Sequence, residues 1–457
     1  VQSNFAEAVA LLEAALPKAE FVAIDCEMTG IRGKPEMWLD SPQLRYSKLK
    51  FIASRYKLIQ VGVAVFYVED GHNKCLPLNF YVFPRDPSEK VILEVGAVAF
   101  NRKNDMDFNK WIYEGIHYID EAGEAQLRNK VYSSEVSNEI VLSRPYDIEM
   151  FREITDRVQA WYLSEETELE IHSLNAFHRK YFYQRVMKDF PDIITETMGD
   201  SKTPTLKLKK ESLSSQGELK EERQRVKFEE GLGFRRVFKM LTASKKPLVG
   251  HSLLIDLMFI YASFKGRLPY HFAEFQALLH EDFPEVYDTR HMFLTIPGFR
   301  EQFEAQRLGA SLTEIHEYIS KTSELVMTLA LGCEKYLGKK AHEAAYDAFV
   351  TGELFLMFRS VVPDFTIYRN LLSLYRSLFT IKLEGGTVLP EGKVLVIKGQ
   401  DLEAKLEGFK VQRIGDSIAL LLLDVGQDEP TELLSSKGIE AADLESQLLQ
   451  DEVKGSD

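Results

Sequence analysis

The feature that most constrains this chain is one apolar strand that carries two carboxylates. Residues 21–30 (FVAIDCEMTG) have apolar side chains on both faces, which is typical of a strand inside a covered sheet. Asp25 and Glu27 lie two positions apart, so they project from the same face of that strand. Two buried anions at this spacing repel each other and lose hydration. A divalent cation offsets both costs, because carboxylate oxygens suit Mg²⁺ or Mn²⁺.

An isolated Asp-x-Glu tripeptide is common, and by itself it favours a simpler interpretation. The two acids would then only accept hydrogen bonds at the frayed end of a strand. The choice between a metal site and a strand end therefore depends on which other polar residues the chain provides.

The overall composition limits the possible functions. A chain of 457 residues has room for about three domains of ~150 residues each. The formal net charge of −14 argues against a protein that holds duplex DNA along its length, but a metal site with local basic and aromatic groups still suits a short RNA strand. The three cysteines have no C-x-x-C spacing, which favours reduced thiols in the nucleus or cytoplasm. The longest apolar run, residues 61–68, is too short to span a membrane.

The first part of the chain predicts three successive strands. Residues 58–68 and 78–83 are rich in β-branched and aromatic side chains, and a turn sequence separates them. No crossover helix is evident between these strands and the strand with the carboxylates. We therefore expect an antiparallel meander.

The pattern of apolar and charged residues changes after Tyr146. Residues 147–163 and 174–188 predict two helices, the second basic and aromatic, and residues 205–210 alternate like an edge strand. Residues 211–230 are rich in Ser, Glu, Lys and Arg and indicate a solvated linker. This region has the character of a module inserted into another domain.

Two later helices carry further polar candidates. A short strand at 246–251 precedes a helix at 253–264, and Asp256 lies in the first turn of that helix. A helix at 340–359 contains His342 and Asp347. Asp256 also fits simple stabilisation of a helix N-terminus, and His342 also fits a surface position. Five residues on an ideal helix correspond to a rotation of about 140°, so His342 either flanks the site of Asp347 or lies in the loop before the helix.

As a set, these residues resemble the pattern of the DEDDh 3′→5′ exonucleases, which is D-x-E, a distant D and then H-x-x-x-x-D. More closely, the chain resembles the poly(A)-specific ribonuclease (PARN) family, including its Trimmer branch, which shortens small RNAs. The resemblance extends to about residue 370. Its blocks are FVAIDCEMTGIR (21–32), LNFYVFP (78–84), DFNKWIYEGIHY (107–118), KPLVGHSLLIDLM (246–258), FPEVYDTR (283–290) and CEKYLGKKAHEAAYDAF (333–349).

The resemblance implies an α/β fold with a particular domain order. A mixed-sheet, RNase H-like nuclease domain would comprise 1–146 and 231–375. An Arg-x-x-x-His-type α+β module would occupy 147–211, a linker 212–230, an RRM-like α+β module 381–440 and an acidic tail 441–457. The chain departs from these patterns in two places. Tyr183 stands where the Arg-x-x-x-His motif places histidine, and residues 381–440 contain no tryptophan.

The resemblance also implies a function. Asp25, Glu27, Asp256 and Asp347 would bind two Mg²⁺ ions, or Mn²⁺, with His342 as general base. Arg290, Arg179 and Lys180 are candidates for phosphate contacts, although a solvated surface also explains the last two. The expected activity is 3′→5′ shortening of single-stranded RNA, above all poly(A), with release of 5′-AMP by a homodimer. Trimming of small RNA 3′ ends and an inactive RNA-binding relative are the alternatives.

Overall fold

A computed structural model describes residues 1–457 except 133–139, 173, 191–192, 199–203, 211–212, 300–310, 322, 339–341, 378, 389–392, 408, 414–416, 424–428 and 445–457. Two compact units are evident. The first comprises Val1–Gly123 and Leu232–Asp457, and the second comprises Glu124–Gly231. The first unit contains the strand with the paired carboxylates.

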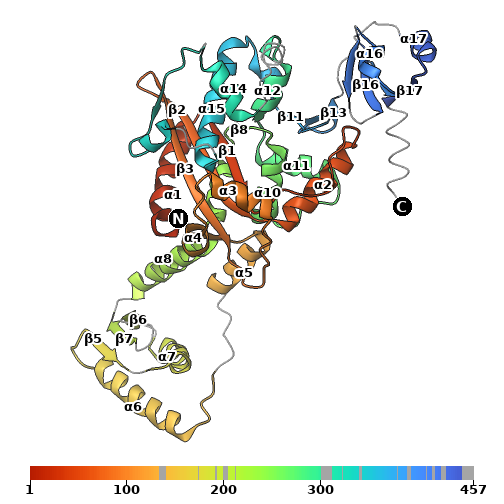
Figure 1. The fold of residues 1–457 in the computed structure, drawn as a ribbon. Coiled ribbons are helices and arrows are strands. Elements are labelled where there is room, and N and C mark those ends of the chain that lie inside the picture. Colours follow the sequence, from red (N-terminus) through yellow and green to blue (C-terminus); the bar gives the residue numbers. More distant parts are fainter. Residues whose placement is uncertain are drawn as a thin grey trace. The chain divides into compact units, whose positions relative to one another are not determined.

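A mixed sheet forms the centre of the first unit (Figure 1). Its main strands are β3 (His72–Pro84), β2 (Leu58–Glu69), β1 (Phe21–Met28), β8 (Leu248–Gly250) and β9 (Val286–Asp288), in that order. Strands β1, β2 and β3 are antiparallel, whereas β1, β8 and β9 are parallel. The strands β4 (Ile116–Tyr118) and β10 (Met327–Leu329) pair with β3 in parallel. The predicted meander and the mixed α/β sheet are therefore confirmed.

One helix between β1 and β2 is absent from the sequence-based expectation. Helix α2 (Pro42–Arg55) begins after Ser41, whose hydroxyl accepts a hydrogen bond from the Leu44 N–H. Its side chains Tyr46, Leu49 and Ile52 are buried against the sheet. Many polar and charged residues lie between these positions, so the helical spacing of the buried side chains is weak in the sequence.

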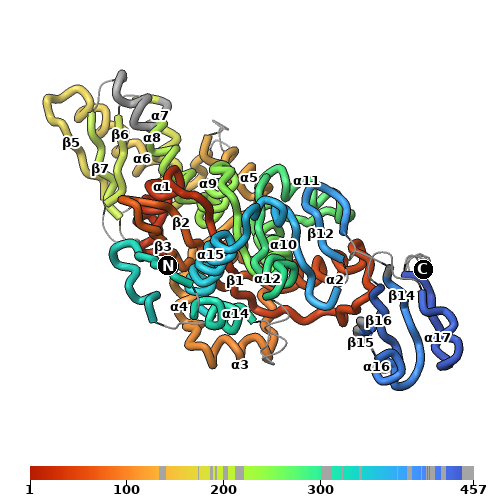
Figure 2. Tube along the Cα trace, turned by 90° about the horizontal axis from the view of Figure 1, so that it is seen from above, coloured from red at the N-terminus to blue at the C-terminus, as the bar shows by residue number. Residues whose placement is uncertain are grey.

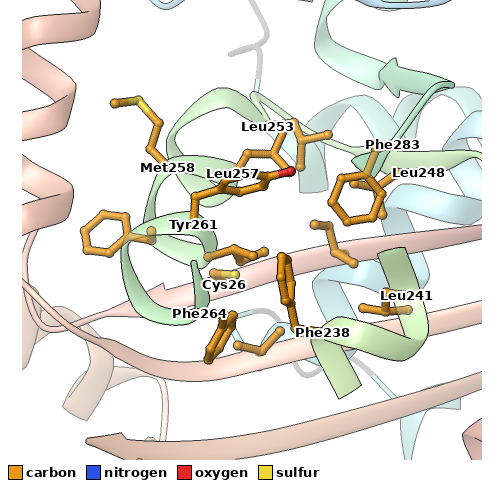
Figure 3. Close-up of a cluster of buried hydrophobic side chains, with 14 of the residues drawn as sticks. Cys26, Phe238, Leu241, Leu248, Leu253, Leu257, Met258, Tyr261, Phe264 and Phe283 are labelled. Atoms are coloured by element: carbon orange, nitrogen blue, oxygen red, sulfur yellow. The ribbon is translucent and has the colours of Figure 1, made fainter. Parts of the chain in front are cut away.

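Helices cover both faces of the sheet and define two cores. One face packs against α1 (Phe5–Ala15), α2, α9 (Arg235–Ser244), α10 (Leu254–Phe264) and α11 (Phe272–Asp282). Figure 3 shows this core around Cys26, Leu257 and Phe238. The other face packs against α12 (Thr289–Thr295), α14 (Leu312–Ile319) and α15 (Ala344–Val361), and Figure 2 shows α15 beside β1 and β2. Because side chains alternate along β1, Ala23, Asp25 and Glu27 face the α15 side.

The remaining elements of the first unit outside its C-terminal region are short. They are η1 (Gln2–Asn4), η2 (Leu16–Lys18), α3 (Val95–Lys103), α4 (Phe108–Glu114), η3 (Glu334–Leu337) and η4 (Phe365–Tyr368), while α5 (Glu121–Tyr132) crosses into the second unit. Cys26, Cys75 and Cys333 are free thiols. Among the residues that the structure describes, no helix is both long and apolar enough to cross a membrane.

The second unit corrects two expectations. It contains α6 (Pro145–Tyr162), α7 (Ala176–Asp189), α8 (Leu213–Leu232) and an antiparallel sheet of β5 (Glu168–Ile171), β7 (Thr205–Lys210) and β6 (Ile193–Met198). Strand β7 is the central strand and not an edge, because Lys207 and Lys209 form ion pairs with Glu168 on β5 and Glu196 on β6.

The predicted linker at 212–230 is also wrong, since helix α8 spans most of it and residues 211–212 lie outside the described part. Many residues of α8 are charged and have good helix propensity, and its apolar side chains Phe228 and Leu232 are buried. The second unit as a whole extends from Glu124 to Gly231, wider than the predicted 147–211.

The C-terminal part begins later than predicted. A small sheet of β11 (Leu371–Ser373), β12 (Thr380–Lys382) and β13 (Thr387–Val388) precedes it. Gln276 on α11 donates a hydrogen bond to the Lys382 carbonyl, which ties this sheet to the nuclease part, so residue 381 is not the start of a separate module.

A four-stranded antiparallel sheet follows, in the order β15 (Lys410–Arg413), β16 (Ile418–Leu423), β14 (Lys393–Lys398) and β17 (Glu440–Asp443), with α16 (Leu402–Lys405) and α17 (Thr431–Ser436). Because β17 pairs with β14, residues 441–443 belong to this sheet and not to an acidic tail. The rest of the predicted tail, 445–457, lies outside the described residues.

The start of α15 lies directly on β2 at Gly62, which pairs with Asp25 of β1. A Cβ atom at Gly62 would overlap the backbone of Ala344 and Ala345. Hence only glycine allows this approach, which brings the first turn of α15 over the two carboxylates.

We expect Gly62→Ala to lower the free energy of unfolding by about 1–3 kcal/mol, the usual cost of overpacking, and to displace the start of α15. Denaturant unfolding measures the first effect. Gly338→Ala is the matched control, because the nearest atom to a Cβ there is 3.9 Å away. Equal stability of the two variants would contradict the close contact.

Candidate active site

Strand β1 presents two carboxylates to the side of the sheet that α15 covers. Asp25 pairs across the ladder with Gly62, and Glu27 pairs with Gln60. Both acids are partly exposed, while the alternating residues Ile24 and Cys26 are buried on the opposite face. The period of the strand therefore places the two carboxylates side by side on the face that α15 covers.

Asp256 reaches the same place from α10. Strands β1 and β8 pair through Val22 and Ala23, and further along β1 the Cys26 N–H donates a hydrogen bond to the Asp256 carboxylate. Helix α10 begins four residues after the end of β8, so Asp256 enters beyond the carboxyl ends of the parallel strands. This is the position at which α/β sheets commonly place ligand sites. The Asp256 side chain is buried, with 7% exposure.

Asp347 and His342 come from the start of α15. The helix begins at Ala344, so His342 lies in the loop before it, which is one of the two arrangements that the sequence left open. The His342 N–H donates a hydrogen bond of 2.9 Å to Oδ2 of Asp347. His342 has a φ of +71°, a left-handed conformation that is costly for a non-glycine residue and that recurs at functional sites.

These groups form one electrostatic cluster. Ligand atoms of Glu27, His342 and Asp347 all lie within 4.8 Å of one another. Burial, together with the neighbouring negative charges, raises the pKa of Glu27 to about 8 and the pKa of Asp347 to about 7. Burial likewise raises the pKa of Asp256 to about 8, and burial and the other three carboxylates raise the pKa of Asp25 well above its usual value. The structure thus brings all five predicted catalytic residues into one cluster, which we call the recess.

The donor set fits a hard divalent cation. Four carboxylates supply the oxygen ligands that Mg²⁺ and Mn²⁺ prefer, and a bound cation would offset the burial and the like charges that raise their pKa values. A ring nitrogen of His342 lies within 4.8 Å of carboxylate oxygens of both Glu27 and Asp347, so its position suits either a ligand or a base. Partial burial lowers the pKa of His342, which favours the neutral imidazole.

Residues that the sequence analysis did not identify hold the start of α15. The Oε1 atom of Gln60 accepts the Ala344 N–H at 3.2 Å. The Oε1 atom of Glu343 accepts hydrogen bonds from the Tyr336 hydroxyl at 2.7 Å and from Lys335 Nζ at 3.1 Å. No local pattern links Gln60 to a residue 284 positions later, so only the folded chain reveals this contact.

Helix α3 brings an aromatic ring to the site. Glu94, the residue before the helix, accepts hydrogen bonds from the backbone N–H groups of Ile31 and Arg32 in the loop after β1. Phe100 on α3 then lies edge-on to the His342 ring, with 4.6 Å between ring centroids. About half of the Phe100 surface stays exposed, at 47%. The sequence analysis did not identify α3 or its aromatic residue.

Of the predicted phosphate contacts, Arg290 lies next to the site. Its N–H donates to Oδ1 of the buried Asp288 at 2.9 Å, and the Ser252 N–H donates to the same oxygen at 3.0 Å. Ser252 belongs to the turn that leads into α10 and Asp256. Burial, with the charge of Arg290 adding to it, lowers the pKa of His251 in this turn to about 3.

Arg179 and Lys180 belong to the second compact unit. The Arg179 guanidinium donates a hydrogen bond to the Leu174 carbonyl at 2.7 Å, and Lys180 is exposed. These contacts within their own unit do not connect either residue to the recess, so their role as phosphate contacts stays a prediction.

The comparisons with known proteins bear on this site. Residues 1–355 match the model of the CAF1 family ribonuclease. The chain is 27% identical to the poly(A)-specific ribonuclease PARN of Xenopus laevis over 400 residues, which are 80% of this chain and 63% of that protein. It is 24% identical to the pre-piRNA 3′-exonuclease trimmer of Bombyx mori over 353 residues, 74% of this chain and 66% of that protein.

The chain spans less than two thirds of the length of these relatives. A solved structure of S. pombe Pop2p with Mg²⁺ and Mn²⁺ bound is 13% identical and covers 82% of this chain and 97% of its own, with a TM-score of 0.41 that is too low to carry an argument. The family assignment instead follows from the family model, which matches more than half of the chain and includes every residue of the recess. The chain belongs to the CAF1 family of ribonucleases.

Proposed function

We propose that this protein is a Mg²⁺-dependent 3′→5′ exoribonuclease that shortens single-stranded RNA, with poly(A) as its main substrate and 5′-AMP as its product. The observation that carries the proposal is the recess in which Asp25, Glu27, Asp256 and Asp347 lie with His342. The family membership and the similarity to a poly(A)-specific ribonuclease support it.

Each residue of the recess has a distinct role in this proposal. The four carboxylates would hold two Mg²⁺ ions. When bound, these ions stabilise negative charge on the reacting phosphate and make a water more acidic. A ring nitrogen of the neutral His342 would accept the proton from the attacking water, and the hydrogen bond from its backbone N–H to Asp347 keeps the loop in place. Arg290 would contact a phosphate next to the turn before α10.

Poly(A) is the favoured substrate because of the similarity to a poly(A)-specific ribonuclease. Phe100 is half exposed and lies against His342, so any base at the 3′ end would find a ring to stack on. Trimming of small RNA 3′ ends is the second candidate. The similarity to the pre-piRNA 3′-exonuclease trimmer favours it specifically.

We propose that the central sheet is RNase H-like. Support comes from the order β3-β2-β1-β8-β9 with β2 antiparallel to its neighbours. The second unit would correspond to the inserted Arg-x-x-x-His-type module, although its histidine, His178, stands one residue before Arg179 and not four residues after it. His178 is buried beside Asp147, with 3.2 Å between Nε2 and Oδ1.

We also propose that the C-terminal sheet is RRM-like. Its chain order is β14-α16-β15-β16-α17-β17 and its sheet order is β15-β16-β14-β17, which is a β-α-β-β-α-β arrangement. The face away from α16 and α17 presents aliphatic side chains, Val394, Val396 and Leu420, and Leu444 packs against them. Because RRM domains stack bases on aromatic residues, we do not assign base or cap recognition to this sheet.

The first experiment tests the activity itself. The purified chain with Mg²⁺ should shorten a 5′-labelled RNA that ends in oligo(A) and release 5′-AMP, more rapidly than RNAs of the same body that end in oligo(U) or oligo(C). EDTA should stop the reaction, and a 3′-phosphate on the substrate should block it. Equal rates on all three ends would favour the trimming function, whereas no hydrolysis at all would favour an inactive RNA-binding relative.

The second experiment tests the metal site without using activity. We expect Asp256→Asn to remain folded, and in EDTA at pH 8 to unfold at a higher temperature than the wild type, because one repelling charge is gone. Mg²⁺ should raise the melting temperature of the wild type and leave that of Asp256→Asn almost unchanged. A similar Mg²⁺-induced increase in both proteins would contradict the metal site.

The third experiment separates the two possible roles of His342. If His342 is the general base, His342→Ala should lower kcat by about 10²–10⁴-fold, while the Mg²⁺ concentration for half-maximal activity stays the same. Added imidazole should then restore part of kcat. If the main effect of His342→Ala is instead a loss of Mg²⁺ affinity, His342 is a metal ligand and not the base.

A further inference from the structure

One exposed aromatic ring lies close to two arginines. Tyr375 follows β11 and is 54% exposed. The guanidinium carbon of Arg290 is 5.7 Å from its ring centroid, and the guanidinium carbon of Arg376 is 5.3 Å away. Core packing does not account for a half-exposed ring, and a single surface cation–π contact contributes little to stability. Flat rings beside positive charges are, however, how proteins hold single-stranded nucleic acid.

The backbone beneath this ring is held from inside the protein. Arg45 on α2 is 1% exposed, and its guanidinium donates hydrogen bonds to the carbonyls of Tyr375 at 2.5 Å and Arg376 at 2.9 Å. Arg45 is itself fixed by Asp40 and Glu36, at 3.1 Å and 2.9 Å. The backbone that carries the Tyr375 ring is therefore held in place before any ligand arrives.

Arg376 adopts a strained conformation to complete this arrangement. Its φ is +47°, in the left-handed region that side chains other than glycine rarely occupy. Such strain persists where the surroundings overdetermine it, and it is frequent at ligand sites. Glycine at this position would relieve the strain, so the side chain of Arg376 is present at a cost to the fold.

Hydrogen bonds connect the ring to the catalytic recess. Arg290 shares the Asp288 carboxylate with the turn that leads to Asp256. His291, the next residue, forms a 2.9 Å hydrogen bond through Nδ1 with Ser373 Oγ on β11. These hydrogen bonds join the segment with Tyr375 and the segment with Arg290 to the turn before α10. We call these joined segments the connected wall.

We propose that Tyr375, Arg290 and Arg376 form a subsite that stacks one base of the RNA substrate and contacts the adjacent phosphate, outside the recess where hydrolysis occurs. This proposal rests on the proposed function, since it presumes an RNA substrate. RNA is favoured over an acidic protein because a half-exposed ring offers its face to a flat partner, which a base provides and a carboxylate does not.

Binding of the full chain to 5′-fluorescein oligo(A) in EDTA, measured by anisotropy, tests the subsite without hydrolysis. We expect Tyr375→Leu to raise Kd by about 5- to 100-fold, the usual effect of losing a stacked base, and Tyr375→Phe to retain most of the affinity. Arg376→Gly should also weaken binding, although the free energy of unfolding of this variant should not be lower than that of the wild type. It should reduce the slope of log Kd against log salt by about 0.7, the contribution of one phosphate contact to a single strand, while Tyr375→Leu leaves the slope unchanged.

Phe51→Leu is the matched control. Phe51 on α2 is 51% exposed and has the Arg55 guanidinium 5.7 Å from its centroid, but it is not part of the connected wall. This variant should bind RNA like the wild type. With Mg²⁺, Tyr375→Leu should raise KM far more than it lowers kcat.

Two failures are distinguishable. If the wild type binds and degrades RNA but Tyr375→Leu binds as tightly as Phe51→Leu, the subsite is wrong and the proposed function stands. If the wild type neither binds nor degrades RNA, the proposed function is wrong and the subsite fails with it. Equal losses in Tyr375→Leu and Tyr375→Phe would also contradict stacking, because phenylalanine keeps the ring.

Discussion

Mutual repulsion among Asp25, Glu27, Asp256 and Asp347 is the constraint around which the first unit is built. Burial and like charges raise the pKa of each of these groups, so the protein alone keeps them together at a cost. Such a cluster persists only if the elements that carry it are held rigidly by contacts elsewhere. The two apolar cores on either side of the sheet supply those contacts.

Two close approaches hold the cluster in place. Helix α15 lies on β2 at Gly62, where no larger residue fits, and Gln60 accepts the first N–H of the helix. On the other side, Asp256 accepts the Cys26 N–H, so the same carboxylate that repels its neighbours also binds the backbone of β1. The repelling groups are thus attached to the sheet by hydrogen bonds that involve the backbone and do not depend on a cation.

Around this centre, the groups suited to a substrate lie on separate short segments. Phe100 comes from α3, Arg290 from α12 and Tyr375 from the loop after β11, and each is positioned by a buried or half-buried polar residue, namely Glu94, Asp288 and Arg45. Asp25 and Glu27 lie on β1, whereas Asp256 and Asp347 lie in the first turns of α10 and α15. Phe100, Arg290 and Tyr375 lie on helices and a loop around them, where residues that contact ligands are often found.

The sequence by itself determined the features that depend on local periodicity. The two-residue spacing of Asp25 and Glu27 places them on one face of a strand, and the β-branched and aromatic runs that become β2 and β3 indicate two further strands. The motif pattern was sufficient to select Asp256, His342 and Asp347, and the structure brings them together. These properties are local, because neighbouring residues set the direction of each side chain.

Only the tertiary structure decided the features that depend on distant contacts. Thr205–Lys210 is a central strand because partners on both sides pair with it, and 213–232 is helical because Phe228 and Leu232 find a core to pack in. His342 adopts its left-handed conformation outside α15 because its N–H bonds to Asp347, and Gly62 is required because a helix almost 300 residues later lies on it. Contacts across such separations leave no periodic signal in the sequence, since each side of the contact obeys its own local pattern.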